Sequence, residues 1–505
     1  MNVAHLFARN ATRAGDLPAI ACGSAVRLTY RELADRAARL AGALRGACGL
    51  SPGDRVALAM ANTPEYVEVL LGCWWAGLAT VPVNAKLHAS EIAWILGHAE
   101  ARVCFATEEL VGGVDGPERV VAIAGDEYRS MLRAEPVPMA EATPDSLAWL
   151  FYTSGTTGRS KGAMITHGNL RAMTYAYLAD VDTIAPGDAI LHAAPMSHGS
   201  GLYILPHAAR GAVQVVPESG GFDPAEIFVL LGRWRGATLF AAPTMVQRLT
   251  RHAAATGPDV ANLKTIVYGG APMYLADLDA AHEVFGFRLA QIYGQGESPM
   301  TITALDKAAH ADTAHPRWRE RLQSVGTAQI VCEIKVGDEA GRSLPTGEVG
   351  EVMARGAAVV PGYWRDPEAT ARTMGDGWLR TGDVGALDED GFLTLKDRSK
   401  DLVISGGSNV YPREVEEALL AHPKVREAAV VGLPDPEWGE RVVACVVAEA
   451  GTGEAELDAW CLARIARFKR PKTYVLLEAL PKNAYGKVLK RKLREGLVTR
   501  PPAAP

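Results

Sequence analysis

The alternation of short apolar runs with helical patterns is the feature that most limits the fold of this 505-residue chain. A short apolar run bounded by turn residues predicts a buried strand, whereas apolar residues at helical spacing predict an amphipathic helix. Strands that alternate with helices favour an α/β core with mostly parallel pairing, because a helix is the usual crossover between parallel strands. Such strand runs occupy residues 56–60, 79–83, 103–106, 120–123, 190–193, 213–216, 239–241 and 265–268.

The pattern of apolar and turn-forming residues changes twice toward the C-terminus, which predicts several structural units. Short strand patterns and Gly-rich turns over about residues 325–398 predict a β-rich subdomain that completes a large N-terminal domain, residues 1–398. The charged run that follows predicts a hinge at residues 399–401, and residues 402–499 then predict a small α+β domain. Within that small domain, helices are predicted from Pro412 and over about 454–467, strands at 428–432 and 442–448, and a disordered tail at 500–505.

Composition and charge exclude several classes of function. The formal net charge of −6 is the wrong sign for a nucleic-acid-binding protein, which usually carries a basic excess. The seven cysteines form no CxxC pair, so we expect reduced thiols and no zinc site, as in a cytoplasmic enzyme. The sequence does not fix an oligomeric state, and a homodimer is one assembly compatible with it.

No segment of the sequence predicts a secretory signal or an integral membrane span. The first ten residues, MNVAHLFARN, contain no apolar core of the kind that a signal peptide needs. The most apolar stretch, residues 69–83, is interrupted by Gly72, Gly77 and Pro82. It is also shorter than the roughly 20 residues that a spanning helix requires, so it predicts a buried helix followed by a strand.

The strongest local motif is the segment YTSGTTGRSKG at residues 152–162, which follows the apolar run 147–151. Glycines let the backbone turn its N–H groups inward, hydroxyls add donors, and a lysine supplies positive charge for phosphate oxygens. A small polar surface loop is the alternative, but the density of hydroxyls around the glycines favours phosphate binding. The spacing differs from the GxxxxGK[ST] loop, because no hydroxyl follows the lysine.

This segment resembles the signature of the ANL superfamily of adenylate-forming enzymes, which includes acyl-CoA synthetases, peptide-synthetase adenylation domains and luciferases. The resemblance implies an ATP-dependent carboxylic acid–CoA ligase that forms an acyl-AMP and pyrophosphate, then acyl-CoA and AMP. Further segments match the family in order along nearly the whole chain: YGGAP at 268–272, IYGQGE at 292–297, GWLRTGD at 377–383, DRSKD at 397–401 and PKNAYGK at 481–487.

The resemblance implies roles for individual residues in binding ATP and magnesium. Glu297 would bind Mg²⁺, Asp383 the ribose hydroxyls, and Tyr293 would stack on adenine. Lys487 would be the main catalyst of adenylation, and His198 would flank the carboxylate of the substrate. The implied nucleotide-binding set is Thr153, Ser154, Gly155, Thr156, Thr157, Gly158, Lys161, Gly270, Ala271, Pro272, Tyr293, Gly294, Gln295, Asp383 and Arg398.

The second half-reaction implies a different set of residues. In the family the C-terminal domain rotates between the two half-reactions, and by resemblance Lys400 is the hinge residue. Gly406, Gly407 and Ser408 would line the channel for the CoA thiol, and Lys469 would contact the CoA phosphates.

The chain departs from the family pattern where small residues replace larger ones. Gly296 stands where most relatives have threonine, so one hydroxyl donor to the α-phosphate is missing, and Gln295 or a water molecule would substitute. Small residues predict a roomy acyl pocket and therefore a medium- or long-chain fatty acid or a ring-bearing acid. The residues assigned to this pocket are Ser197, Gly199, Ser200 and Gly296.

Several alternatives remain open from the sequence. A peptide-synthetase adenylation domain usually carries an aspartate near Phe240, where this chain has Ala241 and Ala242, and we expect no appended carrier domain. A luciferase-like oxygenase, and an acyl-AMP ligase that loads a carrier protein, are further candidates within the family. From another class, the chain could be a nucleotide-binding regulatory module with impaired catalysis, against which the retained Lys161 and Glu297 argue.

Overall fold

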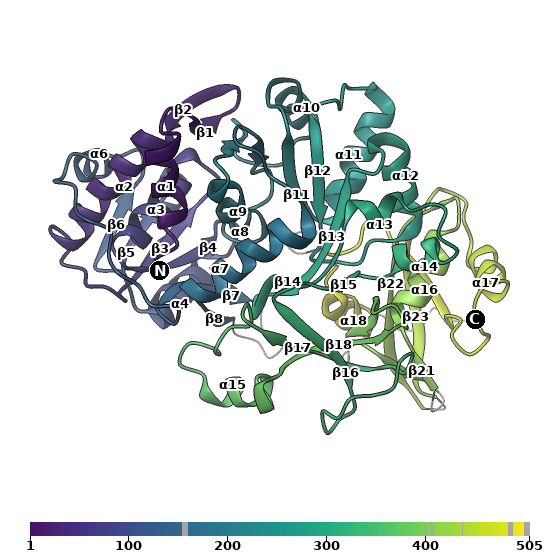
Figure 1. Cartoon of the computed structure of the whole chain (residues 1–505). Coiled ribbons are helices and arrows are strands. Elements are labelled where there is room, and N and C mark those ends of the chain that lie inside the picture. Colours follow the sequence, from purple (N-terminus) through teal and green to yellow (C-terminus); the bar gives the residue numbers. More distant parts are fainter. Residues whose placement is uncertain (154–159, 399–400, 406–407, 437, 483–487, 499–505) are drawn as a thin grey trace.

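Two large β-sheets separated and covered by helices form most of the molecule (Figure 1). The computed structural model describes residues 1–153, 160–398, 401–405, 408–436, 438–482 and 488–498. The α/β class predicted from the alternation of apolar runs is confirmed, and a smaller C-terminal part with its own sheet follows the large N-terminal part.

The first large sheet has six strands in the order β6-β5-β3-β4-β7-β8. Its strands pair in parallel except for the last pair, β7 and β8, which form an antiparallel hairpin. The strands are β3 (Arg55–Met60), β4 (Ala79–Asn84), β5 (Ala101–Ala106), β6 (Arg119–Ala122), β7 (Leu147–Thr153) and β8 (Lys161–Thr166).

The second large sheet has nine strands in the order β15-β14-β13-β12-β11-β9-β10-β1-β2. The strands from β13 to β1 in this order are parallel, and antiparallel strands close both edges. The strands are β1 (Pro18–Cys22), β2 (Ala25–Thr29), β9 (Ala189–Leu191), β10 (Val213–Val216), β11 (Ala237–Ala241), β12 (Leu263–Tyr268), β13 (Leu289–Gln295), β14 (Ser298–Leu305) and β15 (Thr327–Ala328).

Side chains on each strand alternate between the two faces of the sheet, and helices pack on both faces in layers. In β3, Val56 and Leu58 point into one core cluster, whereas Ala57 and Ala59 point into another on the opposite face. The first cluster joins both sheets through α1 (His5–Arg13), α2 (Tyr30–Arg45), α3 (Pro64–Trp75), α7 (His167–Ala176) and α9 (Ile204–Ala209). The outer faces are covered by α4 (Ala89–Ala99) on the six-stranded sheet and by α10 (Pro224–Arg233), α11 (Pro243–Thr256) and α12 (Leu275–Phe285) on the nine-stranded sheet.

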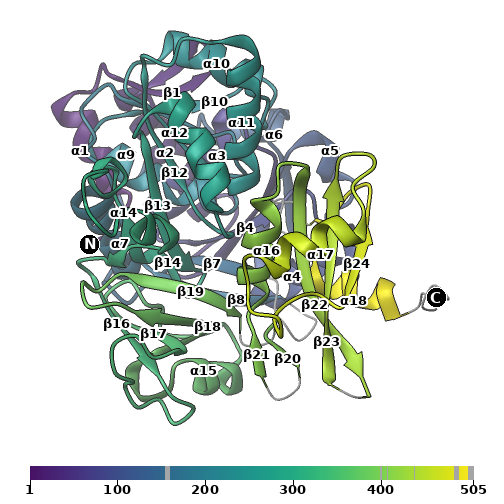
Figure 2. The ribbon, with the colours of Figure 1, turned by 90° about the vertical axis from the view of Figure 1, so that its right-hand side faces the viewer.

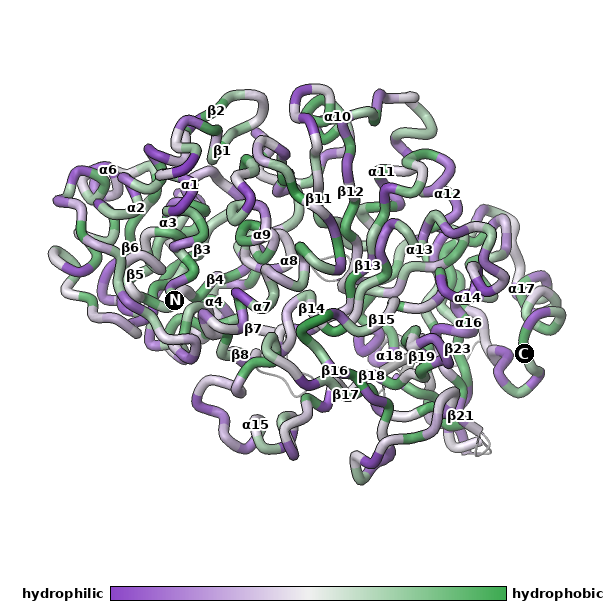
Figure 3. Tube along the Cα trace, in the orientation of Figure 1, coloured by the Kyte–Doolittle hydropathy of each residue, from purple (hydrophilic) through white to green (hydrophobic). Residues whose placement is uncertain are grey.

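Apolar stretches concentrate on the strands and on the inner faces of these helices, and polar stretches lie on outer turns (Figure 3). Within the described part of the chain, none of the helices combines the length and apolarity needed to cross a bilayer. The remaining short helices are α5 (Glu108–Val111), α6 (Asp126–Met131), η1 (Tyr177–Val181), α8 (Gly199–Leu202), α13 (Lys307–Ala311), α14 (Trp318–Gln323), α15 (Pro367–Thr373) and η2 (Gly375–Gly377).

A four-stranded antiparallel sheet follows the nine-stranded sheet along the chain. It begins at Cys332, a few residues after the predicted start of the β-rich subdomain at about residue 325. The difference arises because β15 still belongs to the nine-stranded sheet. Its strands, in sheet order, are β16 (Cys332–Gly337), β17 (Gly350–Gly356), β18 (Leu379–Leu387) and β19 (Leu393–Arg398).

The C-terminal part lies beside the large part as a five-stranded sheet packed with three helices (Figure 2). Strands β22 and β23 are longer than the sequence predicts, because they pair along their whole length. The predicted helix over 454–467 ends at Leu462, after which the chain turns and Arg470 pairs with Asp458. The elements are β20 (Val403–Ser405), β21 (Ser408–Val410), α16 (Pro412–Leu420), β22 (Val425–Asp435), β23 (Gly439–Ala448), α17 (Glu454–Leu462), β24 (Thr473–Leu476) and α18 (Lys490–Val498).

Helix α2, which supports the core between the two sheets, begins with a capping box. The Thr29 hydroxyl accepts a hydrogen bond from the Glu32 amide, and the Glu32 carboxylate accepts one from the Thr29 amide at 2.8 Å. We expect Thr29→Ala to lower the free energy of unfolding by about 1 kcal/mol, whereas Thr29→Ser, which keeps the hydroxyl, stays close to wild type. Urea denaturation of the three proteins tests this, and an alanine variant as stable as the serine variant would contradict it.

Candidate active site

The segments singled out by the sequence gather at one edge of the nine-stranded sheet. Strands β9, β11, β12 and β13 are parallel neighbours, so their carboxyl ends meet at that edge. Open α/β sheets bind their ligands at such an edge. The segments that follow these strands are residues 192–200, 242–243, 269–272 and 296–297.

The hairpin of β7 and β8 brings the predicted phosphate loop to this edge. Thr153 and Lys161 are paired at the end of the hairpin, so the ends of the predicted phosphate loop lie there. Gly296, at the end of β13, lies so close to this hairpin that an added Cβ would be 2.5 Å from the Thr153 side chain. The loop residues Ser154, Gly155, Thr156, Thr157 and Gly158 lie outside the described residues.

Lys161 and Glu297 converge on the side chain of Tyr363. The Tyr363 hydroxyl donates a hydrogen bond of 2.6 Å to Oε1 of Glu297, whose side chain is buried. The Lys161 ammonium lies 5.1 Å from the centre of the Tyr363 ring. Burial, and next the charge of Glu297, raise the pKa of Tyr363 above its usual range, so the phenol stays protonated as the donor. The arrangement places one cation and one carboxylate beside the hairpin turn.

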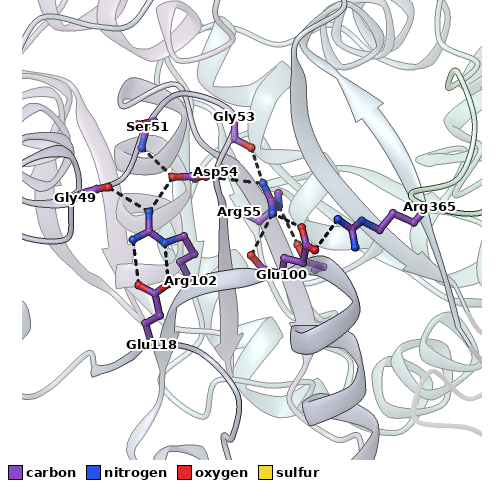
Figure 4. A network of polar contacts seen from close by, with 10 residues as sticks. Gly49, Ser51, Gly53, Asp54, Arg55, Glu100, Arg102, Glu118 and Arg365 are labelled. Atoms are coloured by element: carbon purple, nitrogen blue, oxygen red, sulfur yellow. Dashed lines mark hydrogen bonds and ion pairs between the residues drawn. The ribbon is translucent and has the colours of Figure 1, made fainter.

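Tyr363 is held in place by the strand beside it. The segment around Tyr363 runs along β8, where the Trp364 amide donates to the Gly162 carbonyl at 2.8 Å. The next residue, Arg365, forms an ion pair of 2.6 Å with Glu100, and Glu100 also pairs with Arg55 at the start of β3 (Figure 4). These surface pairs are individually weak, but together they tie the segment to the six-stranded sheet.

A second carboxylate, Asp383, lies where the nine-stranded and four-stranded sheets meet. Its Oδ2 accepts hydrogen bonds of 2.6 Å from the Tyr293 hydroxyl and 2.6 Å from the Gln295 amide. The Gln295 amide also donates to the Thr381 carbonyl at 2.9 Å, so two acceptors already hold it. Arg398 lies opposite Asp383 in the pairing of β18 with β19.

Tyr293, for which the resemblance implies stacking on adenine, is largely buried. Its ring is buried in a core cluster with Ile302 and Val325, and its hydroxyl points to Asp383. In this arrangement the side chain packs and orients a carboxylate. The adenine-side segment Gly270, Ala271 and Pro272 follows β12 and is partly or fully exposed, and Gly270 has a φ of 81°, which favours glycine.

Gly294 is needed because two strands approach each other very closely. A Cβ at this position would lie 2.6 Å from the Met300 amide nitrogen and 2.7 Å from the Ser298 carbonyl oxygen. Met300 itself has a φ of 60°, a left-handed conformation that non-glycine residues rarely adopt. Strained backbone of this kind is common beside functional sites, and here it shapes the turn that carries Glu297.

His198 is held as a neutral imidazole. Its ring packs edge-on against Phe151 at 5.0 Å between centres, and its Nδ1 lies 3.0 Å from the Ser197 hydroxyl. Removal of the ring from water lowers its pKa to about 4. At neutral pH the side chain is therefore a hydrogen-bonding group without charge.

At the two glycines assigned to the acyl pocket, an aromatic ring lies where a side chain would be. A Cβ at Gly199 would lie 2.4 Å from the Phe240 ring, and one at Gly296 would lie 2.9 Å from the Phe151 ring. The Ser200 hydroxyl is buried and lies 2.8 Å from Nδ1 of His192. Here the expected room is filled by aromatic side chains, because a glycine also lets a neighbouring ring approach.

The residues assigned to the second half-reaction are only partly described. Ser408 pairs with Ser405 in the hairpin of β20 and β21, and Lys469 forms an ion pair of 2.6 Å with Glu414. The residues that lie outside the described part of the chain are Lys400, Gly406, Gly407 and Lys487.

Two residues of this region were not singled out from the sequence. Tyr363 follows the turn-like pair Pro361-Gly362, which was the only local signal for it. Phe240 was considered only as a marker for a missing aspartate, and its ring stacks on Tyr203 with 5.3 Å between centres. Neither contact follows from spacing along the chain, since the partners are far apart in sequence.

Comparisons with known proteins agree with this geometry. The family model of AMP-binding enzymes matches residues 7–364, and that of the AMP-binding enzyme C-terminal domain matches residues 414–487. The chain is 37% identical to a feruloyl-CoA synthase from an Amycolatopsis species, covering 92% of this chain and 93% of that one. It is 36% identical to the fatty acid–[acyl-carrier-protein] ligase ScoC of Streptomyces coeruleorubidus, covering 95% and 93%.

Solved structures show the same similarity. The crystal structure of ATP-bound MatB from Rhodopseudomonas palustris matches with a TM-score of 0.89 at 31% identity, covering 99% of both chains. The apo crystal structure of the same protein matches with a TM-score of 0.78 at 31% identity, covering 98% of this chain and 99% of that one.

Restoring the threonine at position 296 is expected to harm the protein. The new Cβ would meet the Thr153 side chain at 2.5 Å and the Phe151 ring at 2.9 Å, so Gly296→Thr forces one of them to move. We expect a loss of stability of about 1–3 kcal/mol, measured by urea denaturation. Gly296→Ala serves as the smaller insertion, and Phe151→Leu combined with Gly296→Thr should recover part of the loss. A threonine variant as stable as wild type would contradict the crowding.

The neutral His198 predicts a loss of stability in acid. The unfolded histidine has a pKa of about 6.5, and burial lowers the folded value to about 4, so between these values only the unfolded chain takes up the proton. The contribution is present above pH 6.5 and is lost as the pH falls toward 4. We expect His198→Gln to reduce the pH dependence of the unfolding free energy by up to about 1.4 kcal/mol per pH unit in this range. His5→Gln, at an exposed position, is the control and should leave the dependence unchanged.

Proposed function

Because the chain belongs to the AMP-binding enzyme family, we propose that it is an ATP-dependent carboxylic acid–CoA ligase. It forms an acyl-AMP with release of pyrophosphate and then transfers the acyl group to CoA with release of AMP. The observation that carries this proposal is the convergence of Lys161 and Glu297 on Tyr363, beside the turn of the β7–β8 hairpin. A cation and a carboxylate at that turn are what a magnesium-bound triphosphate needs.

The donor set fits a magnesium ion that is shared with the nucleotide. Among the described residues there is no group of three or more His, Cys, Asp or Glu side chains that could hold a metal by themselves. Mg²⁺ usually takes one or two carboxylates and completes its shell with phosphates and water, and Glu297 supplies one carboxylate. The ion, when bound, neutralises charge on the phosphates. The hydrogen bond from Tyr363 fixes the direction of the carboxylate.

The nucleotide would lie along the carboxyl edge of the nine-stranded sheet. Thr153, Lys161 and the residues from Ser154 through Gly158 would hold the phosphates, and Gly270, Ala271 and Pro272 would border the base. Asp383 would accept hydrogen bonds from the ribose hydroxyls, and Tyr293 and Gln295 orient its carboxylate through Oδ2. Arg398, which is paired with Asp383 along the strands, is proposed to hold the ribose or a phosphate.

Lys487 is the residue that we propose as the main catalyst of adenylation. Two anions approach each other when a carboxylate attacks the α-phosphorus of ATP, and an ammonium between them stabilises the developing charge. His198, which is neutral, would donate or accept a hydrogen bond at the substrate carboxylate without competing as a cation.

The C-terminal part would serve the second half-reaction. We propose a large domain of residues 1–398 with a β-rich subdomain at about 325–398, a hinge at 399–401 centred on Lys400, and a small domain at 402–499. Gly406, Gly407 and Ser408 would line the thiol channel. Lys469 would reach the CoA phosphates only after leaving Glu414, to which it is now paired. The reaction would take place in the cytoplasm.

The substrate is proposed to be a ring-bearing acid or a medium- or long-chain fatty acid. Aromatic side chains, Phe151 and Phe240, occupy the space beside Gly296 and Gly199. Flat apolar walls of this kind favour an apolar or aromatic acyl group over acetate. The relatives include both classes, a feruloyl-CoA synthase and a fatty acid ligase.

A carrier protein is the alternative acceptor. The ScoC relative is named as a ligase for an acyl carrier protein and is 36% identical over 492 residues. The same first half-reaction would then precede transfer to the thiol of a carrier-bound arm.

The test measures both half-reactions with purified protein. We expect pyrophosphate and acyl-CoA from ATP, Mg²⁺, CoA and one class of acid in a panel that runs from acetate through fatty acids to hydroxycinnamic acids. Lys487→Ala should lower the rate of pyrophosphate release at least about a hundredfold, as expected for loss of a charge-stabilising group. Lys492→Ala, in the same basic run but exposed, is the control and should retain activity.

Each other outcome points to a different function. Pyrophosphate without acyl-CoA, even with CoA present, would favour a carrier protein as acceptor. A preference for acetate would overturn the proposed substrate class. Binding of ATP without pyrophosphate for any acid would overturn the ligase proposal and favour a regulatory module.

A further inference from the structure

A hydrogen bond joins the large part of the molecule to the helix that opens the C-terminal part. The Tyr274 hydroxyl donates to Oε2 of Glu416 at 2.9 Å. Tyr274 is the residue that precedes α12, and Glu416 lies in the middle of α16. Helix α16 also contacts the large part through Arg413, whose guanidinium donates to the Leu395 carbonyl at 3.2 Å. Figure 2 shows α16 on the side of the C-terminal part that faces the large part.

Glu416 is held firmly by its own part of the molecule. Its Oε1 accepts a hydrogen bond of 2.8 Å from the Val430 amide and lies 2.9 Å from the Lys490 ammonium. The residue is almost fully buried, at 3% exposure. A buried carboxylate needs its full set of donors, because it has lost the water that would otherwise solvate it. Tyr274 supplies the donor for the second oxygen, and it does so only while the two parts keep this arrangement.

Tyr274 also lies beside the segment proposed to border the nucleotide base. Pro272 ends that segment, and the buried Met273 is the only residue between Pro272 and Tyr274. Burial, and next the charge of Glu416, raise the pKa of Tyr274 above its usual range, so it remains a donor throughout the physiological pH range. A ligand that orders residues 270–272 therefore also affects the position of Tyr274, which follows them in the chain after one residue.

Two crystal structures of one comparison protein match this chain to different degrees. One protein, MatB, matches this chain with a TM-score of 0.89 in its ATP-bound crystal structure and 0.78 in its apo crystal structure. The covered shares of this chain, 99% and 98%, are nearly equal, so this chain superposes more closely on the ATP-bound structure than on the apo structure over the same length. The present arrangement, which contains the Tyr274–Glu416 hydrogen bond, is therefore the one that we assign to the nucleotide-bound state.

We propose that Tyr274 is a positioning residue whose hydrogen bond to Glu416 holds the C-terminal part in the arrangement that forms the acyl-AMP. The proposal rests on the proposed ligase function. A contact that exists in only one of two arrangements stabilises that arrangement by the free energy of the contact. The equilibrium between the two arrangements shifts by the same amount. Loss of the contact therefore slows the half-reaction that needs this arrangement and leaves the other half-reaction unchanged or faster.

Tyr274→Phe tests this, because it removes the hydroxyl and keeps the ring. We expect release of pyrophosphate from ATP and acid to slow about ten- to a hundredfold in a single turnover, the size of one hydrogen bond to a charged group. Transfer from preformed acyl-AMP to CoA should keep its wild-type rate or rise. The thermal unfolding midpoint should stay within about 2 °C of wild type. Tyr175→Phe, at a half-exposed position on α7, is the matched control and should change neither half-reaction.

Other outcomes would overturn the proposal. Equal slowing of both half-reactions together with a lower unfolding midpoint would mean that Tyr274 is only structural. Unchanged pyrophosphate release would mean that the hydrogen bond does not set the arrangement.

A measurement without turnover separates this proposal from the ligase proposal. Small-angle X-ray scattering of wild type and Tyr274→Phe, without nucleotide and with ATP, reports the arrangement directly. We expect the variant to depart from the wild-type profile without nucleotide. Wild type that binds ATP but releases no pyrophosphate with any acid would overturn the ligase function, and the scattering would still decide whether Tyr274 holds the arrangement. Identical profiles for the two proteins would overturn the positioning role.

Discussion

Hydrogen bonds from tyrosine hydroxyls to buried carboxylates are the interaction on which the proposed chemistry depends. Glu297 is held by Tyr363, and Asp383 is held by Tyr293, in each case at 2.6 Å. A phenol orients a carboxylate as firmly as a neutral donor can, and it does so without cancelling the negative charge. An arginine in the same place would form a bidentate pair and compete with a metal ion or a ribose. The tyrosines therefore preserve the charge that Mg²⁺ and the nucleotide are proposed to use.

These carboxylates can act together because parallel strands end at a common edge. Glu297 follows β13, and the base-side segment follows the neighbouring strand β12. The hairpin of the other large sheet reaches the same place through the contact of Gly296 with Thr153, and β18 brings Asp383 from the third sheet. Three separate sheets thus meet beside the end of the β7–β8 hairpin, and the close approach at Gly296 is what permits it. A side chain at Gly296 would push the hairpin and β13 apart, whereas one at Gly294 would push apart β13 and β14 within the nine-stranded sheet.

The sequence was sufficient to predict the fold class and most strands. The spacing of apolar residues and the length of each apolar run are properties of neighbouring residues, so they can be read along the chain. The helix at Pro412 and the capping box at Thr29 were predicted for the same reason, since their signals are local. The space around the small residues could not be predicted. Gly199 suggested room for an acyl group, whereas Phe240, about forty residues away, fills the place of its missing side chain. Tyr363 escaped notice because its partner Glu297 is 66 positions away along the chain.

Gly296 has a different physical meaning once its neighbours are known. From the sequence alone, Gly296 replaces a threonine that most relatives have, and the missing hydroxyl suggests a weakened contact to phosphate. In the structure the space that a side chain would need is taken by Thr153, which carries a hydroxyl of its own, and by the Phe151 ring. The Phe151 ring in turn packs against His198, which is neutral because the ring and its neighbours exclude water. The glycine therefore belongs with an aromatic wall beside the proposed carboxylate site, and we expect it to vary together with Phe151.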